Sequence, residues 1–303
     1  MSDPMTPPPP SNLSEEHIQL LKQQSSLLQS INKSLQEQNR LTEAIAKIAL
    51  KDTLAEVDRE IQSRQLTMLE TMEHIQSGRS IARWGDGEIR LMLQPEFELS
   101  FQTPNKKLAS TLRQILINKD AEDDRLLLAF PTVYVSRLWL GIWAENWHHL
   151  KPLLQTSTTK WANTHVSRPL FFQKHGQAAV ESWRSVWENK SVCVIAGKGS
   201  RFELLPQLFD NTLKITRLDA PPRNAFDDLP NLIETIDATE EHDLYLCALG
   251  PTGTVLAAYL SSPEGGARHS IDIGHLAASY ANVFLGGKFP EQLTINSEKS
   301  TEK

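Results

Sequence analysis

The chain has 303 residues, of which 40% are apolar and 22% charged, as is typical of a soluble globular protein with one large or two modest domains. Its formal net charge of -6 argues against a general nucleic-acid-binding protein, which normally presents a basic surface. No apolar run is long enough to span a bilayer, and the N-terminus lacks the basic start and apolar core of a secretory signal. We therefore expect no transmembrane segment and a cytoplasmic protein, with a peripheral position at the inner membrane face as the alternative.

The two cysteines, Cys193 and Cys247, both lie within apolar runs. This placement predicts small buried side chains in a reducing compartment, and neither a disulfide framework nor a metal site.

The N-terminal part divides into a proline-rich tail over residues 1–12, predicted to be disordered, and a helical segment over residues 13–62. The helical segment carries two rows of residues at seven-residue spacing, one of leucines and one of isoleucines and glutamines: Leu21, Leu28 and Leu35, then Gln24, Ile31, Gln38 and Ile45. These rows indicate a short coiled-coil seam with polar interruptions. A long helix on the surface of a globular domain is the alternative, but we favour a homo-oligomer formed through this segment.

A globular domain is predicted over residues 63–290, followed by a flexible polar tail over residues 291–303. A helical pattern runs from Leu66 to Ile75, after which short apolar runs alternate with helical stretches. The expected strands are residues 81–84, 126–130, 192–196, 213–218, 244–249 and 270–273. The expected helices are residues 106–118, 136–150, 174–188, 202–209, 224–236, 252–260 and 275–282. This alternation predicts a Rossmann-like α/β fold, with a mostly parallel sheet and helices on both faces. Ligands bind such sheets outside the carboxyl ends of the strands, where the candidate site residues fall.

The first candidate site is Asp86 and Glu88, which follow the first strand, with Gly85 before them and Gly87 between them. The two glycines permit a sharp turn that presents both carboxylates. Hard oxygen ligands suit Mn²⁺ or Mg²⁺, above all when a substrate phosphate completes the coordination. The simpler interpretation is that Asp86 caps the following helix and Glu88 supports its first turn.

Two glycine-containing turns follow later strands, at residues 197–201 and 250–255. Each is expected to lead into a helix N-terminus, whose free backbone N–H groups suit an anion. Neither turn matches a Walker loop or the dinucleotide fingerprint. The phosphate-binding candidates here are Gly197, Gly199, Ser200, Arg201, Gly250, Thr252, Gly253 and Thr254. Thr252 is also a candidate cap of the helix that follows.

A third connection, residues 219–226, contains Pro221 and Pro222, which stiffen it. Asn224 is a candidate cap of the next helix. With Phe226, it is also suited to bind a flat base by amide hydrogen bonds and stacking.

The last strand carries Asp272 and is followed by Gly274 and His275, which is a candidate metal ligand or proton carrier. Arg168, within Ser167-Arg168-Pro169, is expected either to pair with a carboxylate or to hold a phosphate. Trp139, Trp143 and Trp147 share one helix face, and core packing is favoured over a sugar-binding platform.

Five short motifs occur in order along the chain: residues 83–88, 167–169, 222–226, 249–256 and 271–275. With these motifs the chain resembles the bacterial glycosyltransferases of the GT-D fold, formerly a domain family of unknown function. The resemblance covers about Leu66 to Phe289 and leaves the N-terminal helix outside it.

The resemblance implies a Rossmann-like, UDP-sugar-dependent hexosyltransferase, with a glycan or a glycosylated protein as acceptor. The family's Asp-x-Glu motif binds a divalent cation, usually manganese, and corresponds to Asp86 and Glu88. Its nucleotide-binding elements are similar to the Leu-Gly-Pro-Thr turn and the Pro-Arg-Asn-Ala-Phe loop. We therefore expect the nucleotide and its phosphates to be bound by residues that follow several of the strands: Arg83, Arg168, Gly197, Gly199, Ser200, Arg201, Pro222, Asn224, Phe226, Gly250, Thr252, Gly253 and Thr254.

One departure from the family pattern concerns the segment after Asp-Ile-Gly-His, which in the family carries further acidic residues. Residues 276–282 contain none here, so His275 and Asp272 become the candidate general bases. The same departure favours the alternative function, a catalytically inactive nucleotide-sugar-binding scaffold assembled by the N-terminal helix. A phosphatase or nucleotidyltransferase on a similar sheet is a third possibility.

Overall fold

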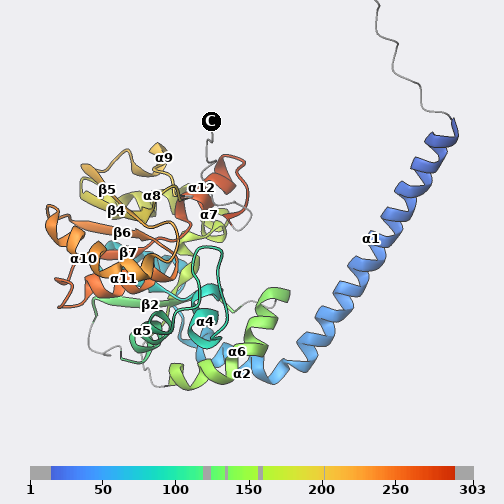
Figure 1. Cartoon of the computed structure of the whole chain (residues 1–303), viewed down its shortest axis with the longest axis horizontal. Coiled ribbons are helices and arrows are strands. Elements are labelled where there is room, and N and C mark those ends of the chain that lie inside the picture. The colour runs from blue at the N-terminus through green and yellow to red at the C-terminus, as the bar shows by residue number, and fades with distance from the viewer. Residues whose placement is uncertain (1–14, 119–123, 134–135, 156–159, 201, 291–303) are drawn as a thin grey trace, which may run out of the picture. The chain divides into compact units, whose positions relative to one another are not determined.

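The computed structural model describes residues 15–118, 124–133, 136–155, 160–200 and 202–290 (Figure 1). The chain divides into two units, Met1–Lys51 and Asp52–Lys303. The first unit contains helix α1 (Glu15–Ala49), in which no residue is buried. The predicted tails over residues 1–12 and 291–303 lie outside the described residues.

The second unit opens with helix α2 (Lys51–Glu60), so the helical segment predicted over residues 13–62 is divided at Leu50. Helix α2 belongs to the globular unit because Val57 is fully buried and Glu56 contacts two residues of a later helix, Trp147 and Lys151. Glu56 Oε2 accepts a hydrogen bond of 3.0 Å from Trp147 Nε1 and lies 2.9 Å from Lys151 Nζ.

All strands of the second unit belong to one parallel sheet, as the alternation of apolar runs and helices predicts. They are β1 (Ser80–Arg83), β2 (Leu126–Phe130), β3 (Ala162–Asn163), β4 (Ser191–Gly197), β5 (Lys214–Ala220), β6 (Leu244–Ala248) and β7 (Ser270–Asp272). Their order in the sheet is β3-β2-β1-β7-β6-β4-β5. Six of the seven were predicted within one or two residues, and the two-residue β3 was missed because it is too short to carry an apolar pattern.

The helices of this unit cover both faces of the sheet. They are α2, α3 (Met68–Gln76), α4 (Asp86–Leu93), α5 (Lys106–Ile117), α6 (Arg137–Gln155), α7 (Pro169–His175), α8 (Gln177–Trp187), α9 (Pro206–Phe209), α10 (Leu229–Ala238), α11 (Pro251–Ser261) and α12 (Leu276–Phe284). None of the described helices has the length and apolar content needed to cross a membrane.

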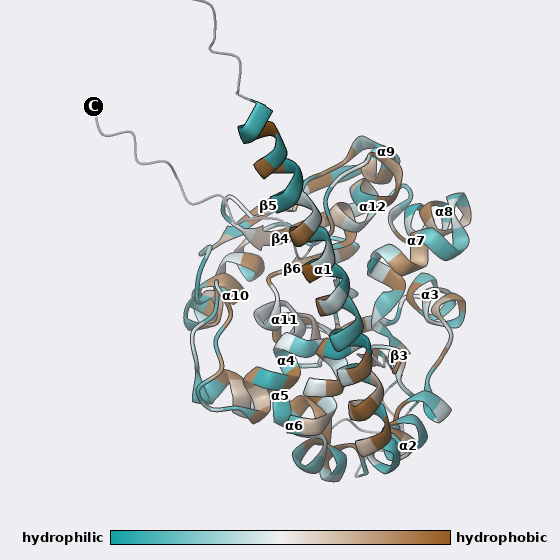
Figure 2. Cartoon of the chain, turned by 90° about the vertical axis from the view of Figure 1, so that its right-hand side faces the viewer, coloured by the Kyte–Doolittle hydropathy of each residue, from teal (hydrophilic) through white to brown (hydrophobic). Residues whose placement is uncertain are grey.

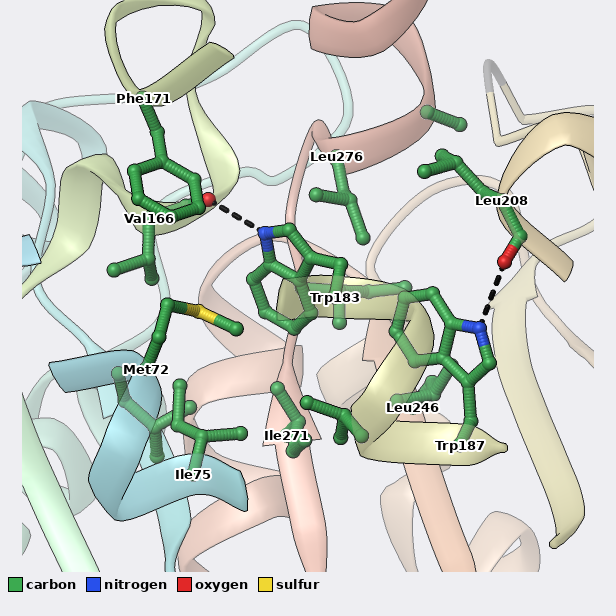
Figure 3. Close-up of a cluster of buried hydrophobic side chains, with 14 of the residues drawn as sticks. Met72, Ile75, Val166, Phe171, Trp183, Trp187, Leu208, Leu246, Ile271 and Leu276 are labelled. Carbon is green, nitrogen blue, oxygen red and sulfur yellow. Dashed lines mark hydrogen bonds between the residues drawn. The ribbon is translucent and has the colours of Figure 1, made fainter. Parts of the chain in front are cut away.

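The core is built from alternate residues of each strand, because successive side chains point to opposite faces of a sheet. In β6, for example, Leu246 packs on one face, with α3, α7, α8, α9 and α12, and Cys247 on the other, with α10 and α11. Figure 3 shows the first of these clusters, in which the Trp183 and Trp187 indoles donate hydrogen bonds of 2.7 and 2.8 Å to the carbonyl oxygens of Val166 and Leu208.

Two expectations about buried side chains are confirmed. Cys193 and Cys247 are fully buried and unpaired, and burial raises the pKa of the Cys193 thiol to about 12. Trp139, Trp143 and Trp147 are buried on α6, and neighbouring rings contact one another. The predicted core role of these tryptophans therefore holds.

Three predicted helices start or break differently, in each case near a proline or glycine. The helix expected over residues 202–209 is α9, which begins only at Pro206, where the fixed φ of proline suits a first helical position. The helix expected over 174–188 is two helices, α7 and α8, divided at Gly176 with a φ of +54°. The helix expected over 224–236 is a 3-10 turn over residues 225–228 followed by α10.

The two central strands β1 and β7 are neighbours, and the chain leaves them toward opposite faces. After β1 it enters α4, which packs in one hydrophobic cluster, and after β7 it enters α12, which packs in the other. In open parallel sheets such a divergence marks the usual ligand site, the crevice expected at the carboxyl ends of the two strands.

Candidate active site at the carboxyl edge of the sheet

The centre of the candidate site is Arg83, the last residue of β1. Its Nη2 atom donates to Asp272 Oδ1 of β7 at 2.8 Å, and its Nη1 atom donates to Ser167 Oγ, beyond β3, at 2.8 Å. The Arg83 side chain is 12% exposed and that of Asp272 is 2% exposed. Arg83, predicted to bind phosphate, thus links three strand ends inside the protein.

Asp272 accepts further hydrogen bonds that hold it in place. Gly274 N–H donates to Oδ1 at 3.1 Å, and the Thr254 hydroxyl lies 3.1 Å from Oδ2. The same hydroxyl lies 3.0 Å from the carbonyl oxygen of Arg83, so its single proton is shared between two acceptors. The fully buried Thr254 therefore fixes α11 against β1 and β7.

Gly274 is required next to Arg83 for two reasons. Its φ of +46° lies in the left-handed region, and a Cβ at this position would collide with the guanidinium of Arg83. Gly274, which follows β7, therefore leaves the space that the guanidinium of Arg83, at the end of β1, occupies.

Asp86 and Glu88 lie in the first turn of α4, but their roles in capping differ from the simpler interpretation. The N-cap residue is Gly85, and Asp86 is the first helical residue. Glu88 provides the capping contact, because its Oε2 accepts a hydrogen bond of 2.8 Å from Gly85 N–H. Asp86 is half-buried.

The Glu88 carboxyl has an unusual electrostatic environment. Burial and the nearby carboxylates of Asp272 and Asp86 raise the pKa of Glu88 to about 7, although the hydrogen bond from Gly85 N–H acts in the opposite direction. The negative charges of Asp272, on β7, and of Asp86, after β1, thus both act on the Glu88 carboxyl.

The third group at this edge is Arg168 and His275. Arg168 Nη1 lies 2.7 Å from His275 Nδ1. A guanidinium can only donate, so Nδ1 accepts and the neutral imidazole carries its proton on Nε2. Arg168 is the N-cap residue of α7, and Pro169 begins that helix. His275 precedes α12, in line with its expected position.

His165 is a buried residue near this group that carried no signal in the sequence. Burial and the charges of Arg168 and Arg83 lower the pKa of His165 to about 4, so this imidazole is neutral at physiological pH.

The two glycine turns lead into different structures. The β6 turn does lead into a helix: Gly250, with a φ of +55°, precedes Pro251 as the N-cap of α11, and no side chain caps the helix start. Thr252, a candidate cap, is instead the second helical residue and is almost fully buried. The preceding β6 strand is the neighbour of β7, which places this helix start beside the Asp272 network. Pro251 has no N–H, and the N–H groups of Gly253 and Thr254 donate to the Gly250 carbonyl at 2.8 and 3.3 Å.

The β4 turn is not at a helix N-terminus, because the next helix is α9. Gly199 has a φ of +65°, Ser200 N–H donates to the Gly197 carbonyl at 2.9 Å, and Lys198 N–H donates to the Ala220 carbonyl at 2.8 Å. A Cβ on Gly197 would lie 3.6 Å from Pro222 Cα, so this turn packs against the β5 loop. Arg201 lies outside the described residues.

Asn224 holds the β5 loop to a segment that the sequence did not single out. It has a φ of +50°, its side-chain oxygen accepts hydrogen bonds of 2.9 and 3.1 Å from Thr103 N–H and Oγ, and its own N–H donates to the Phe101 carbonyl at 2.9 Å. It does not cap the next helix by its side chain. Phe226 is 6% exposed and lies in the hydrophobic core between α5, α10 and α11.

The segment between α4 and α5, residues 94–105, therefore touches several of the predicted elements. Leu99 lies against Gly87 in α4, and the Phe101 ring fills the space beside Gly250 so closely that a Cβ there would come within 2.7 Å of it. This segment contains no glycine, and its acids Glu96 and Glu98 do not follow a predicted strand, so the sequence analysis did not place it at the site.

Comparison with known proteins agrees with this geometry. A family model described as "Glycosyltransferase GT-D fold" matches residues 81–301. The chain is 28% identical over 266 residues to "Glycosyltransferase GlyD" of Streptococcus pneumoniae serotype 4, and 27% identical over 249 residues to "Probable glycosyl transferase Gly" of Streptococcus gordonii. These matches cover 84% and 78% of this chain but 32% and 36% of the relatives, so the chain spans about a third of their length.

Two solved structures are also similar. One, described as "The highly conserved domain of unknown function 1792 has a distinct glycosyltransferase fold", shares 29% sequence identity and a TM-score of 0.66, covering 80% of this chain and 89% of that one. The other, "A New Glycosyltransferase (DUF1792) from Streptococcus sanguinis", shares the fold at 24% identity and a TM-score of 0.62, covering 74% and 85%. The residues that match the family model include the carboxyl end of every strand described above, and the chain belongs to the family of glycosyltransferases with the GT-D fold.

Proposed function

We propose that this protein is a metal-dependent glycosyltransferase that moves a hexose from a UDP-sugar to a glycan or to a glycosylated protein. The observation that carries the proposal is the group of carboxylates at the crevice between β1 and β7. Burial, together with the charges of Asp272 and Asp86, raises the pKa of Glu88 to about 7. A cation would relieve the repulsion within this group, whereas a purely structural helix cap would gain nothing from it.

The donor set fits Mn²⁺ or Mg²⁺ bound together with a diphosphate. Among the residues that the structure describes, no group of three or more His, Cys, Asp or Glu side chains could hold a metal ion by itself. Asp86 and Glu88 would supply two oxygen ligands, and substrate phosphates and water would supply the others, as is common for hard cations. The cation would act as a Lewis acid that neutralises charge on the departing UDP.

The N-terminus of α11 supports a diphosphate at the same strand ends through the positive end of its helix dipole. Direct hydrogen bonds from this turn are restricted, because Pro251 has no N–H and the N–H groups of Gly253 and Thr254 donate to the Gly250 carbonyl. Gly250 allows the backbone to turn there, while Thr254 fixes the helix to Asp272. Arg168 brings a positive charge to the β3 side of the crevice.

The protonation of His275 suggests how it would act on the donor. Because Nδ1 accepts from Arg168, the proton on Nε2 is suited to a hydrogen bond with a phosphate oxygen. Proton acceptance at Asp272 would compete with its bonds to Arg83, Thr254 and Gly274. As a general base, His275 would have to release Arg168 from Nδ1, and Asp272 would have to release one of its three partners. A pH–rate profile of each variant would distinguish a proton acceptor from a binding residue.

Replacement of Asp86 by Asn tests the proposal directly. We expect Mn²⁺-dependent release of UDP from the preferred UDP-sugar to fall by about 10²-fold or more, because one charged ligand is lost while the helix start is preserved. Asp58→Asn, an exposed acid on α2, is the matched control and should retain full turnover. Unchanged turnover and unchanged Mn²⁺ affinity in the Asp86→Asn protein would refute the metal assignment.

A second candidate function is a nucleotide-sugar-binding scaffold without transfer activity. The absence of acidic residues from positions 276–282 favours it, because a general base from that segment is then missing. A scaffold would bind UDP-sugars in calorimetry without releasing UDP in any acceptor mixture. An enzyme would release UDP and form a glycoside, and release of phosphate or nucleoside monophosphate instead would indicate a phosphatase or nucleotidyltransferase.

We also propose a cytoplasmic location. The two buried, unpaired cysteines are compatible with a reducing compartment.

A further inference from the structure

Helix α1 carries a continuous apolar stripe that nothing in its own unit covers. No residue of α1 is buried, and brown hydrophobic residues recur along it between teal ones (Figure 2). The larger side chains of the stripe are between 52% and 76% exposed: Leu20, Leu21, Leu27, Leu28, Ile31, Leu35, Leu41, Ile45 and Ile48. A single helix in water gains most of its stability by packing such a stripe, so α1 requires a partner.

The stripe follows a heptad in which three positions are apolar. With Leu21, Leu28 and Leu35 at position a, Ile31 and Ile45 fall at position d. Position g adds a third row to the same face: Leu20, Leu27, Leu41 and Ile48. Ser34 interrupts this row, and Thr42 follows Leu35 at position a. The stripe is thus broader than the two-row seam of a two-stranded coiled coil.

The charges of α1 lie away from the stripe. Lys33, Arg40 and Lys47 occupy position f, and their acidic neighbours are Glu37 and Glu43. Arg40 pairs with Glu37 at 3.4 Å and Lys47 pairs with Glu43 at 2.7 Å within the helix. No charged residue separates the apolar rows between Leu20 and Ile48.

We propose that α1 associates with the α1 helices of further copies of this chain, as a parallel bundle of three or four helices. Leucine at a with isoleucine at d is the combination that shifts parallel coiled coils from dimers to trimers and tetramers. The apolar g row then has a partner in the adjacent helix of the bundle. This inference is independent of the catalytic proposal, because it rests on residues outside the sheet.

The surface available is large enough for such an assembly. At the exposures given above, the stripe side chains offer on the order of 1,000 Å² of apolar area per copy, against about 800 Å² per partner in a standard stable interface. The composition of α1 disfavours a membrane surface as the occupant. Its four acidic and four basic residues cancel, and it has no tryptophan, tyrosine or phenylalanine, whereas membrane-surface helices are enriched in basic and aromatic residues.

Gln24 and Gln38 would set the register of the bundle. Both occupy position d and are two heptads apart, so in a parallel bundle each meets its own counterpart in the neighbouring copies. Polar layers of this kind weaken a bundle but exclude staggered alignments, in which an amide would face leucine or isoleucine.

The mass of the full chain in solution tests the proposal. We expect sedimentation velocity to give three or four times the chain mass of 34.1 kDa. Leu28→Glu with Leu35→Glu should yield a monomer, with self-association weakened by roughly 10³-fold or more, because two charges then lie in the seam. The matched control, Ser26→Glu with Lys33→Glu, introduces the same residue at the same spacing on the outer face and should keep the wild-type mass.

A second pair of measurements keeps these results interpretable. The thermal transition of the globular unit should be unchanged in both double variants, which shows that they are folded.

Gln24→Leu with Gln38→Leu should raise the melting temperature of the assembly, and a lower value would contradict the placement of the glutamines in the seam. A monomeric wild-type chain would overturn the proposal, in favour of a membrane occupant if that monomer binds liposomes. A dimer would overturn the inferred number of helices.

Discussion

Arg83 and Gly274 form a complementary pair in which the side chain of one occupies the space that the other leaves empty. The guanidinium lies where a Cβ of residue 274 would be, and it holds both Asp272 and Ser167. Removing either partner of a buried ion pair leaves an uncompensated charge, which is costly. This pair therefore fixes the relative positions of the β1 and β7 ends.

We expect Gly274→Ala to destabilise the protein by about 2–4 kcal/mol and to reduce UDP release, since Arg83 must move away from Asp272. The estimate adds the cost of a positive φ for alanine to that of a disturbed buried pair. Gly176→Ala has a similar φ but nothing within 4 Å of the new Cβ, and should cost only about 1 kcal/mol. Chemical denaturation of both variants measures the difference, and equal losses would show that the guanidinium is easily displaced.

His269, at the start of β7, gives a prediction of pH dependence away from the site. Burial lowers its pKa to about 4, and its Nε2 lies 3.2 Å from the Arg79 carbonyl. The unfolded chain therefore binds a proton below about pH 6.5 that the folded chain does not, so stability falls as the pH drops from about 6.5 toward 4. In His269→Gln, which keeps a donor for the Arg79 carbonyl, this loss should be smaller by on the order of 3 kcal/mol at most.

Denaturation midpoints at about pH 7.5 and about pH 4.5 measure this effect, and parallel curves for the two proteins would contradict it. His165, with a pKa of about 4, should contribute in the same direction and remains in both proteins.

At the residue scale, sequence reasoning found several members of the site but not their partners. Asp272, Thr254 and Arg83 were all selected for ligand contact, yet they bond to one another across 189 residues of sequence. No local sequence pattern shows that Arg83, at the end of β1, packs against Gly274, which follows β7. His165 was missed for the same reason, because its lowered pKa comes from burial and from distant charges.

The segment of residues 94–105 is the element that connects the loops after β5 and β6 to helix α4. It reaches Gly87 through Leu99, Gly250 through Phe101 and Asn224 through Thr103. Because it touches three strand-end connections, its position should govern access to the crevice more than the turns themselves do.

Asn224→Ala should release this segment. It removes the acceptor of two hydrogen bonds from Thr103 and places alanine at a φ of +50°, for a combined cost of about 2–4 kcal/mol. We expect the KM for the UDP-sugar to rise several-fold with a smaller change in kcat. Asn189→Ala, at an exposed asparagine with a φ of +55°, controls for the backbone cost alone. If both variants had equal KM values, the segment would have no role in binding.

At the element scale, prediction succeeded for strands and was weaker for the connections. Buried parallel strands are continuous apolar runs, which the sequence displays directly. Helix starts differ from the predicted ones where Pro206 and Gly176 override the apolar pattern. The Asn224 side chain accepts a hydrogen bond from Thr103 in a loop and does not cap a helix. These outcomes depend on tertiary contacts that no short window contains.

At the scale of the whole molecule, the junction between α1 and α2 separates two units of different character. Up to Ala49 no helical residue is buried, whereas Val57 and Ile61 are fully buried a few residues later. The sequence predicted one helical segment through residue 62 because its apolar spacing continues across Leu50. The structure therefore gives a testable position for the end of the first unit.

We expect a chain that starts at residue 52 to keep the melting temperature of the globular unit within about 2 °C, because none of the side chains described over residues 15–51 is buried. A chain that starts at residue 62 loses Val57, Ile61 and the Glu56 contacts with Trp147 and Lys151, and should melt lower by about 5 °C or more. Scanning calorimetry of the two truncations measures the difference. Equal melting temperatures would mean that α2 does not stabilise the globular unit.

The central place of β1, between β2 and β7, has a consequence for biosynthesis. On the ribosome β1 emerges early and can pair with β2, but its other edge stays open until β7 has been made, 189 residues later by the spacing of Arg83 and Asp272. At translation rates of about 5–20 residues per second this delay is roughly 10–40 s. Throughout that interval the nascent chain exposes an apolar strand edge that chaperones can recognise, and Arg83 has no Asp272 to bind. The contact between Arg83 and Asp272 can therefore form only after β7 has been made, however early β1 leaves the ribosome.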